Sequence, residues 1–220
     1  RDLIAWYRRE LTKYPIEVKL NTEVNCLCEV KADEIIIATG STPNRIPVPG
    51  IDKGIQAIDF LLGKQEVGEN VTIIGGGLTG CEIAYDLALQ GKHPVIIEMT
   101  PYLVGARGIN MANSTMLREL LRFHEVPAYV NTTVEAIRDD GVLINTPNGA
   151  RRLFADSVIM SVGYTPDKRF AGPAKGKVGE LAAKVLPNHD RVRFIGDCDS
   201  VGSLKTVIRQ AYELVQEISY

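Results

Sequence analysis

Residues Val71 to Met99 read VTIIGGGLTGCEIAYDLALQGKHPVIIEM, and this stretch decides the fold. An apolar strand pattern runs into the glycine loop GGGLTG at residues 75–80, and a helix pattern follows it. A second apolar run then ends on an acid, Glu98. This order predicts a dinucleotide-binding βαβ unit, with the pyrophosphate at the N-terminus of the helix, where free N–H groups favour negative charge.

Each glycine of this loop has a physical role in such a unit. Gly75 permits the tight turn, Gly77 leaves room for a pyrophosphate to approach the backbone, and Gly80 allows close packing of the helix on the sheet. The alternative is an unrelated glycine-rich turn, but the strand before the loop and the helix after it favour the nucleotide site. We therefore predict coenzyme contacts at Gly75, Gly77, Leu78, Thr79 and Gly80.

The acid at the end of the second strand predicts which coenzyme binds. A carboxylate at Glu98 accepts hydrogen bonds from a ribose 2′-hydroxyl and repels a 2′-phosphate, so NAD(H) is favoured over NADP(H). We predict coenzyme contacts at both Glu98 and Met99. Met99 and the residues directly after it offer no cation for such a phosphate, although Arg107 lies further on in the sequence. The plain alternative for Glu98 is a surface glutamate without a ligand.

Composition excludes several classes of protein. The 220 residues carry a formal net charge of −2, which gives no electrostatic reason to expect nucleic acid or an anionic membrane as partner. No apolar run approaches the roughly 20 residues that span a bilayer, and no signal-peptide pattern opens the chain. We expect a cytoplasmic protein. Because the chain begins at Arg1 and enters a helical pattern at once, we also expect a fragment of a longer polypeptide.

The four cysteines, Cys26, Cys28, Cys81 and Cys198, are scattered. So few cysteines in a chain of this length predict reduced thiols rather than a disulfide framework. Cys26 and Cys28 alternate along an expected strand and could hold half a metal site. No second pair is visible, so we expect a structural role for them and no metal.

Other elements follow from periodicity. Helices are expected at residues 3–11, 111–124 and 203–220, and an antiparallel meander at 132–153 because Asp-Gly and Asn-Gly turn signals interrupt its alternating pattern. Strands are expected at the ranges 16–20, 34–38, 127–130, 157–161 and 192–195, a short strand or hairpin at 24–30, and a surface loop at 168–184. The run EIIIA at 34–38 is typical of a strand buried on both faces. The proline-rich TPNRIPVPG at 42–50 marks a connector between domains.

Three of these strands end in a glycine turn. Thr39-Gly40, Val162-Gly163 and Gly196-Asp197 each follow a buried strand. Any one of them could be a plain turn, but together they suggest two sheets with nucleotides near the carboxyl ends of the strands.

The segments IIIATGSTPNRIPVPG, VTIIGGGLTGCEIAYDLALQGKHPVIIEM and RVRFIGDCDS resemble those of flavoprotein reductases with two dinucleotide-binding domains. Their residue patterns are similar to those of the C-terminal FAD/NAD(P)-binding region in the NADH:flavin oxidoreductase family, which includes 2,4-dienoyl-CoA reductase and 2-enoate reductases. The resemblance implies an α/β fold in which a Rossmann-like NAD-binding domain, with βαβ units and a meander, is inserted in a partial FAD-binding domain. The domains would be 70–164 for NAD(H), and 1–69 with 165–220 for FAD.

The resemblance also implies cofactor contacts and partners. Thr39, Gly40, Gly196 and Asp197 would approach FAD, and Gly163 the NAD(H) site. The family's first glycine loop for FAD, its N-terminal barrel with FMN and its iron–sulfur cysteines have no counterpart in this sequence. Partners would be small dinucleotides and that barrel of the parent chain.

The implied activity is transfer of hydride from NADH to FAD for onward reduction of an enoate- or enoyl-type substrate by the full-length protein. No catalytic side chain is required for that step, because the cofactors carry the chemistry. The isolated fragment is expected to be inactive. Two alternatives stay open: a nucleotide-binding or scaffold module without turnover, and a pyridine nucleotide-disulfide reductase-like protein, which the absence of a Cys-x4-Cys pair disfavours.

Overall fold

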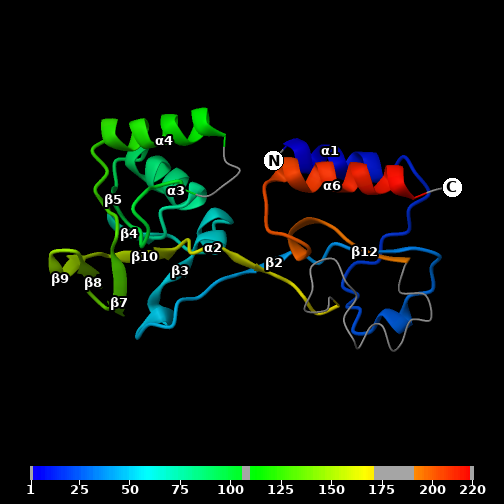
Figure 1. Ribbon diagram of the computed structural model, residues 1–220, viewed down its shortest axis with the longest axis horizontal. Coiled ribbons are helices and arrows are strands. Elements are labelled where there is room, and N and C mark those ends of the chain that lie inside the picture. The colour runs from blue at the N-terminus through cyan, green and yellow to red at the C-terminus, as the bar shows by residue number, and fades with distance from the viewer. Residues whose placement is uncertain (1, 106–109, 171–190, 219–220) are drawn as a thin grey trace. The chain divides into compact units, whose positions relative to one another are not determined.

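The computed structural model describes residues 2–105, 110–170 and 191–218, and Figure 1 shows the order of their elements. The chain forms two compact units. Unit 1 comprises Arg1–Thr39, Lys168–Ser200 and Leu204–Tyr220, and unit 2 comprises Gly40–Asp167 and Val201–Ser203. These boundaries differ from the predicted domain borders at 69/70 and 164/165, and the assignment of NAD(H) and FAD to the two parts stays a prediction.

A five-stranded parallel sheet of order β3-β10-β4-β5-β6 is the centre of unit 2. Its strands are β3 (Ile55–Gln56), β4 (Asn70–Ile74), β5 (His93–Ile97), β6 (Ala128–Tyr129) and β10 (Ser157–Met160). The central strands β4 and β10 are almost wholly buried, because their continuous apolar runs place apolar side chains on both faces of the sheet.

Helices cover one face of this sheet and a meander covers the other (Figure 1). The helices are α2 (Ala57–Leu61), α3 (Leu78–Leu89) and α4 (Met111–Phe123); Ile83, Leu87 and Leu121 are in one core cluster with Val71 and Ile73. The meander consists of β7 (Thr133–Arg138), β8 (Gly141–Thr146) and β9 (Gly149–Phe154). Apolar residues of the meander pack with the opposite face of β4, β5 and β10. The layers confirm the predicted Rossmann-like α/β class.

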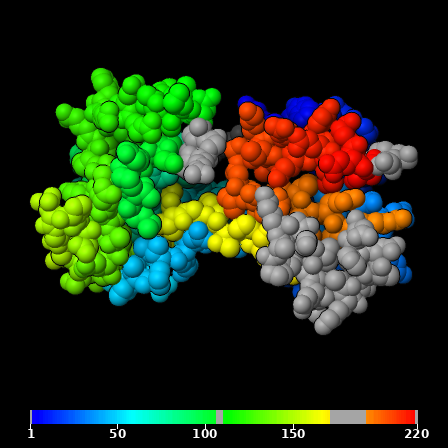
Figure 2. All heavy atoms as spheres, viewed as in Figure 1, coloured from blue at the N-terminus to red at the C-terminus, as the bar shows by residue number. Residues whose placement is uncertain are grey.

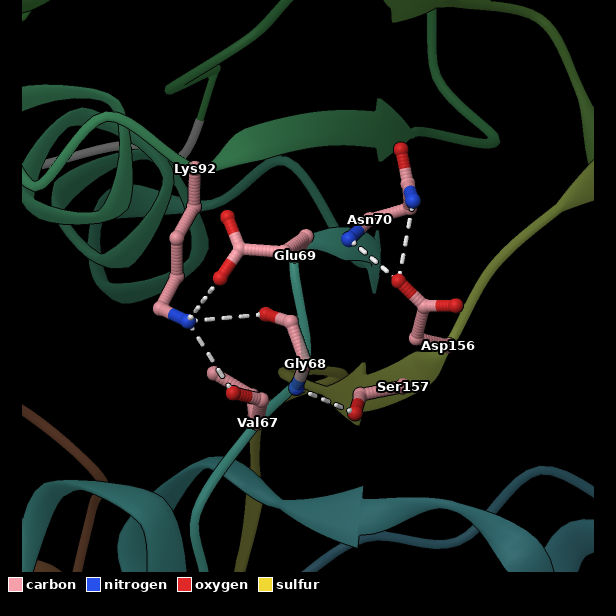
Figure 3. Close-up of polar contacts among 7 residues, drawn as sticks. All are labelled: Val67, Gly68, Glu69, Asn70, Lys92, Asp156 and Ser157. Atoms are coloured by element: carbon pink, nitrogen blue, oxygen red, sulfur yellow. Dashed lines mark hydrogen bonds and ion pairs between the residues drawn. The ribbon is translucent and has the colours of Figure 1, made fainter.

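Polar contacts join the amino ends of β4 and β10 (Figure 3). Asp156 Oδ2 accepts hydrogen bonds from the backbone N–H of Asn70 at 2.8 Å and from its side-chain Nδ2 at 2.9 Å. Lys92 Nζ donates to the carbonyls of Val67 and Gly68. The hydrogen bonds from Asn70 hold the pKa of Asp156 below its usual range. These contacts fix the strand starts at the end of the sheet opposite the glycine loop.

The segments that flank the sheet in unit 2 are short. β2 (Ser41–Pro43) and β11 (Tyr164–Pro166) pair as an antiparallel ribbon, and the 3-10 turn η2 (Ile51–Lys53) precedes β3. The proline-rich connector at 42–50 therefore begins within a strand and leads directly into a 3-10 turn, where only a linker is expected from its composition.

Unit 1 has a small sheet of two parallel strands, β1 (Ile35–Ile37) and β12 (Val192–Phe194). Its other described elements are α1 (Asp2–Leu11), the 3-10 turns η1 (Leu27–Glu29) and η4 (Gly196–Cys198), and α6 (Leu204–Glu217). Leu27, Ile37, Val192 and Cys198 form its described core cluster. Figure 2 shows α6, in orange to red, at the molecular surface, and Ile208 and Tyr212 of this helix are exposed.

Several predictions for unit 1 are wrong. Residues 16–20 form no strand and are exposed, and the range 24–30 contains η1 rather than a strand. Ile36 is 44% exposed, so β1 is not buried on both faces. Cys26 and Cys28 are joined by a disulfide, which corrects the expected reduced state, whereas Cys81 and Cys198 are free and buried.

Two predicted features lie outside the described residues: Arg107, and most of the loop at 168–184. Within the described ranges, no helix combines the length and apolar character needed to cross a membrane. The same residues contain no group of three or more His, Cys, Asp and Glu side chains that could hold a metal ion.

Candidate dinucleotide site

The glycine loop follows β4 at the carboxyl end of the sheet. Gly75 has φ +104°, a conformation that L side chains rarely adopt, and its N–H donates to the carbonyl of Ile97 at 2.8 Å. A Cβ at this position would collide with the backbone carbonyl of Ser161 on the neighbouring segment. The tight turn predicted at Gly75 therefore requires glycine for two reasons, backbone conformation and space.

Gly77 and Gly80 have contrasting surroundings. A Cβ built on Gly80 would collide with the carbonyl oxygen of Gly75, so the first turn of α3 packs directly against the loop. A Cβ on Gly77 would meet no atom within 4 Å. Gly77 is the N-cap of α3 and makes no side-chain cap, which leaves the helix N-terminus open on that side.

Glu98 follows β5 directly and binds the loop. Its Oε2 accepts a hydrogen bond from the backbone N–H of Gly76 and its Oε1 from that of Thr100, each at 2.7 Å. The side chain is half-buried. From the sequence we predict that the Glu98 carboxylate binds a ribose. The sequence gives no sign of its two contacts with backbone N–H groups, because backbone donors carry no sequence signature.

A second set of contacts braces the loop from the side of α4. The Val104 N–H donates to the carbonyl of Gly76 at 2.8 Å, and Arg118 Nη1 donates to the carbonyl of Leu103 at 3.1 Å. Val104 is 3% exposed and has φ +52°, which is unusual for a β-branched residue. Cys81 Sγ also contacts the Gly76 carbonyl, and burial, assisted by the charge of Glu98, raises the pKa of the Cys81 thiol to about 12.

A cavity of about 440 Å³ opens beside the loop, within the range of about 300–1,000 Å³ usual for ligand pockets. Five predicted residues line it: Gly75, Gly77, Glu98, Met99 and Gly163. Leu78, Thr79 and Gly80 are in the first turn of α3 and are not among its lining residues. Apolar residues that the sequence reasoning missed, including Ile46, Val48 and Val134, complete the wall.

Asn44 is a further residue that sequence reasoning missed. Its N–H donates to the carbonyl of Gly163 at 3.0 Å, its Nδ2 to that of Val162 at 3.2 Å, and its Oδ1 accepts from Thr165 Oγ1 at 2.6 Å. Asn44 therefore fixes the turn at Gly163, which has φ +83°. Its place in the proline-rich connector hid this role, since the composition there indicates only a linker.

The predicted FAD contacts follow the strands of unit 1. Ile37 and Phe194 are register partners in the parallel pair, so Thr39 and Gly196-Asp197 follow neighbouring strands at the same end of the sheet. Gly196 has φ +68°, and its N–H donates to Gln210 Oε1 at 2.8 Å. Gly40 belongs to unit 2, where its carbonyl accepts from the Asp167 N–H. Gln210 was not predicted, because its amide is one of several polar groups on α6.

The model of the pyridine nucleotide-disulphide oxidoreductase family matches residues 11–217. The chain belongs to this family. Members of the family bind FAD and NAD(P) and carry out redox reactions, so this oxidoreductase has the general role that its glycine loop indicates. The fold and the family together confirm the resemblance to the FAD/NAD-binding region of enoate reductase-type flavoproteins.

Similar proteins support the same placement. Cinnamate reductase of Clostridium sporogenes is 34% identical over 99% of this chain and 32% of the relative. A metal reductase of Desulforamulus reducens is 29% identical over 90% of this chain and 33% of the relative. The structure of 2-naphthoyl-CoA reductase with 2-naphthoyl-CoA matches with a TM-score of 0.79 and 29% identity, over 99% of this chain and 32% of that one. The chain thus spans about a third of the length of these proteins.

Proposed function

We propose that this chain is the NADH-binding, FAD-associated part of a flavin oxidoreductase. The observation that carries the proposal is the glycine loop, which is closed to a side chain at Gly75 and Gly80 and open at Gly77, next to a carboxylate fixed at Glu98. An NAD(H) pyrophosphate fits this arrangement, because the open position faces free space at a helix N-terminus.

Each residue of the site has a binding or positioning task. Gly77 and the first turn of α3 offer backbone N–H groups to phosphate oxygens, and Glu98, oriented by Gly76 and Thr100, offers lone pairs to ribose hydroxyls. Ile46, Val48 and Val134 exclude water from the cavity. NADH supplies a hydride and FAD accepts it when both are bound, so the residues of this chain need only bind and orient.

Coenzyme choice is the sharpest test of the proposal. We expect NADH to bind at least about tenfold more tightly than NADPH, equivalent to about 1.4 kcal/mol, because the Glu98 carboxylate repels a 2′-phosphate. Titration of the purified chain with both coenzymes, followed by nucleotide fluorescence, measures the ratio of Kd values. Equal affinities, preference for NADPH, or no binding of either would contradict the proposal.

Glu98→Ala refines this test. Loss of the carboxylate should bring the two Kd values together, and it should also weaken NADH, since the Gly76 and Thr100 N–H groups lose their acceptor. The matched control is Glu69→Ala, which removes a carboxylate of unit 2 that lies near Lys92 at the opposite end of the sheet. The control should leave the ratio of Kd values unchanged.

For the full-length protein we propose electron flow from NADH through FAD, an iron–sulfur cluster and FMN to an enoate- or enoyl-type substrate in the cytoplasm. The proposal draws on the reductases that this chain resembles, whose names specify cinnamate and 2-naphthoyl-CoA. In unit 1 we place FAD contacts at Thr39 and Gly196-Asp197, whereas the first FAD glycine loop of the family that the sequence resembles has no counterpart in this sequence. We therefore expect the isolated chain to bind NADH without turnover.

A binding module without flavin is the second candidate, favoured by the single glycine loop of the G-x-G-x-x-G type in this sequence. The visible absorption spectrum of the full-length protein distinguishes the two. Bound flavin near one per chain, bleached on addition of NADH, supports the oxidoreductase. A colourless full-length protein that still binds NADH supports the module.

A further inference from the structure

We propose that Cys26 and Cys28 form a thiol–disulfide exchange site in unit 1, which reacts with low-molecular-weight thiols and dithiols. The two cysteines are disulfide-bonded across a single residue. This site is separate from the glycine loop in unit 2, and the proposal does not depend on the coenzyme that binds there.

The local structure leaves one of the two cysteines exposed and anchors the backbone between them. Cys28 is exposed and Cys26 is half-buried, whereas Leu27 between them is 4% exposed and packs in the core cluster with Ile37 and Val192. The 3-10 turn is closed further by the Val30 N–H, which donates to the Leu27 carbonyl at 3.1 Å. A thiol reagent can therefore reach Cys28 while Leu27 holds the turn in place.

The disulfide adds little to the stability of the fold. A cross-link stabilises mainly by restricting the unfolded chain, and its effect grows with the length of the loop that it closes. A loop of one intervening residue therefore restricts the unfolded chain much less than a long loop does. Exposed disulfides are also those that thiols reduce most readily, and in reducing compartments disulfides are usually transient and catalytic or redox-sensing.

The contacts also give the exchange a direction. The Cys28 N–H donates a hydrogen bond to Cys26 Sγ at 3.2 Å, which stabilises negative charge on that sulfur. A reagent thiolate attacks Cys28 Sγ; a new S–S bond forms there, the Cys26–Cys28 bond breaks, and Cys26 leaves as a thiolate that takes up a proton. The second thiol of a dithiol then displaces Cys28 as the thiol. Two electrons reach the protein, and the reagent becomes a cyclic disulfide.

Thiol mapping by mass spectrometry tests the proposal on the whole chain. The native protein is equilibrated with mixtures of reduced and oxidised dithiothreitol, free thiols are alkylated, and trypsin releases residues 20–31 by cleavage after Lys19 and Lys31. In oxidising mixtures we expect this peptide to be unalkylated and two hydrogens lighter than the reduced peptide. In reducing mixtures we expect it to be doubly alkylated, and the change between the two forms should be one reversible transition. The circular dichroism spectrum and the Tm should stay unchanged across that transition.

Two controls define the site. Cys81 and Cys198 are buried, so they should stay unalkylated in the native protein at every mixture. Cys26→Ser removes the resolving partner, so oxidised glutathione should leave a mixed disulfide on the exposed Cys28 that a second protein thiol no longer resolves. Two reduced cysteines in the peptide at every mixture, a pair that reduces only in denaturant, or a large fall in Tm on reduction would each overturn the proposal.

Discussion

At the scale of single residues, substitutions at Gly77 and Gly80 should affect different properties: the affinity for NADH at Gly77 and the stability of the fold at Gly80. Because a methyl group at Gly77 enters open space, Gly77→Ala should change the free energy of unfolding by no more than about 1 kcal/mol, typical of changes at a helix cap. The same methyl group occupies the region that we assign to the pyrophosphate. We expect the Kd for NADH to rise by about tenfold or more, equivalent to about 1.4 kcal/mol, as measured by titration calorimetry.

Gly80→Ala is the matched control, and we expect it to lower the stability of the fold. Its methyl group collides with the carbonyl of Gly75, which is backbone and cannot turn away. Overpacking of this kind costs about 1–3 kcal/mol, so the Tm should fall clearly in thermal unfolding. If Gly77→Ala destabilised the fold as much as Gly80→Ala, or left NADH binding unchanged, the assignment of the open side to the pyrophosphate would be wrong.

At the scale of elements, α4 supports the loop through Arg118. Removal of its hydrogen bond to the Leu103 carbonyl frees the segment that holds Gly76 through Val104. We expect Arg118→Leu to cost about 1 kcal/mol of stability, near the net value of one hydrogen bond, and to weaken NADH binding. Arg118→Lys, which keeps a charged donor, should restore part of the binding. Unchanged NADH binding in Arg118→Leu would exclude a role in the site for the hydrogen bond between Arg118 and the Leu103 carbonyl.

The junction of β4 and β10 should make stability depend on acid. Asp156 has a folded pKa below its usual 3.8, because Asn70 donates to the charged form. A depressed pKa adds stability above the unfolded value, and this stability is lost as the pH falls through the folded pKa. In Asp156→Asn the free energy of unfolding, measured by urea unfolding, should therefore decrease less steeply as the pH falls below about 4. Asn70→Ala keeps the backbone donor and should reduce this pH dependence less.

Elements differ in how far the sequence could predict them. VTII at 71–74 and SVIM at 157–160 became central strands because a continuous apolar run fits a parallel strand covered on both faces. IEVKL at 16–20 alternates equally well but is exposed, since alternation alone supplies no partner strand. The turn at Gly75 and the close packing at Gly80 were predictable from the glycine pattern, whereas the role of Gly77 at a pyrophosphate stays a prediction. The contacts of Glu98 and Asn44 were not, because they join segments that only the folded chain brings together.

At the scale of the whole molecule, the two units should differ in stability. In unit 2, large apolar clusters cover both faces of the sheet. The described part of unit 1 has a single small cluster, and α1 buries none of its residues. Trp6, the only tryptophan of the chain, is on α1 and reports on unit 1. We expect its fluorescence to change at lower urea concentration than the main circular dichroism transition.

Coenzyme should then act on one of the two transitions only. A ligand that binds the native state adds RT ln(1 + [L]/Kd), about 2.7 kcal/mol at a hundredfold excess over Kd. With the glycine loop in unit 2, NADH should move the circular dichroism transition to higher urea and leave the Trp6 transition in place. NADPH at the same concentration should move it less, because the Glu98 carboxylate opposes a 2′-phosphate. A single transition, shifted equally by both coenzymes at both probes, would mean that the units unfold together and that Glu98 does not select the coenzyme.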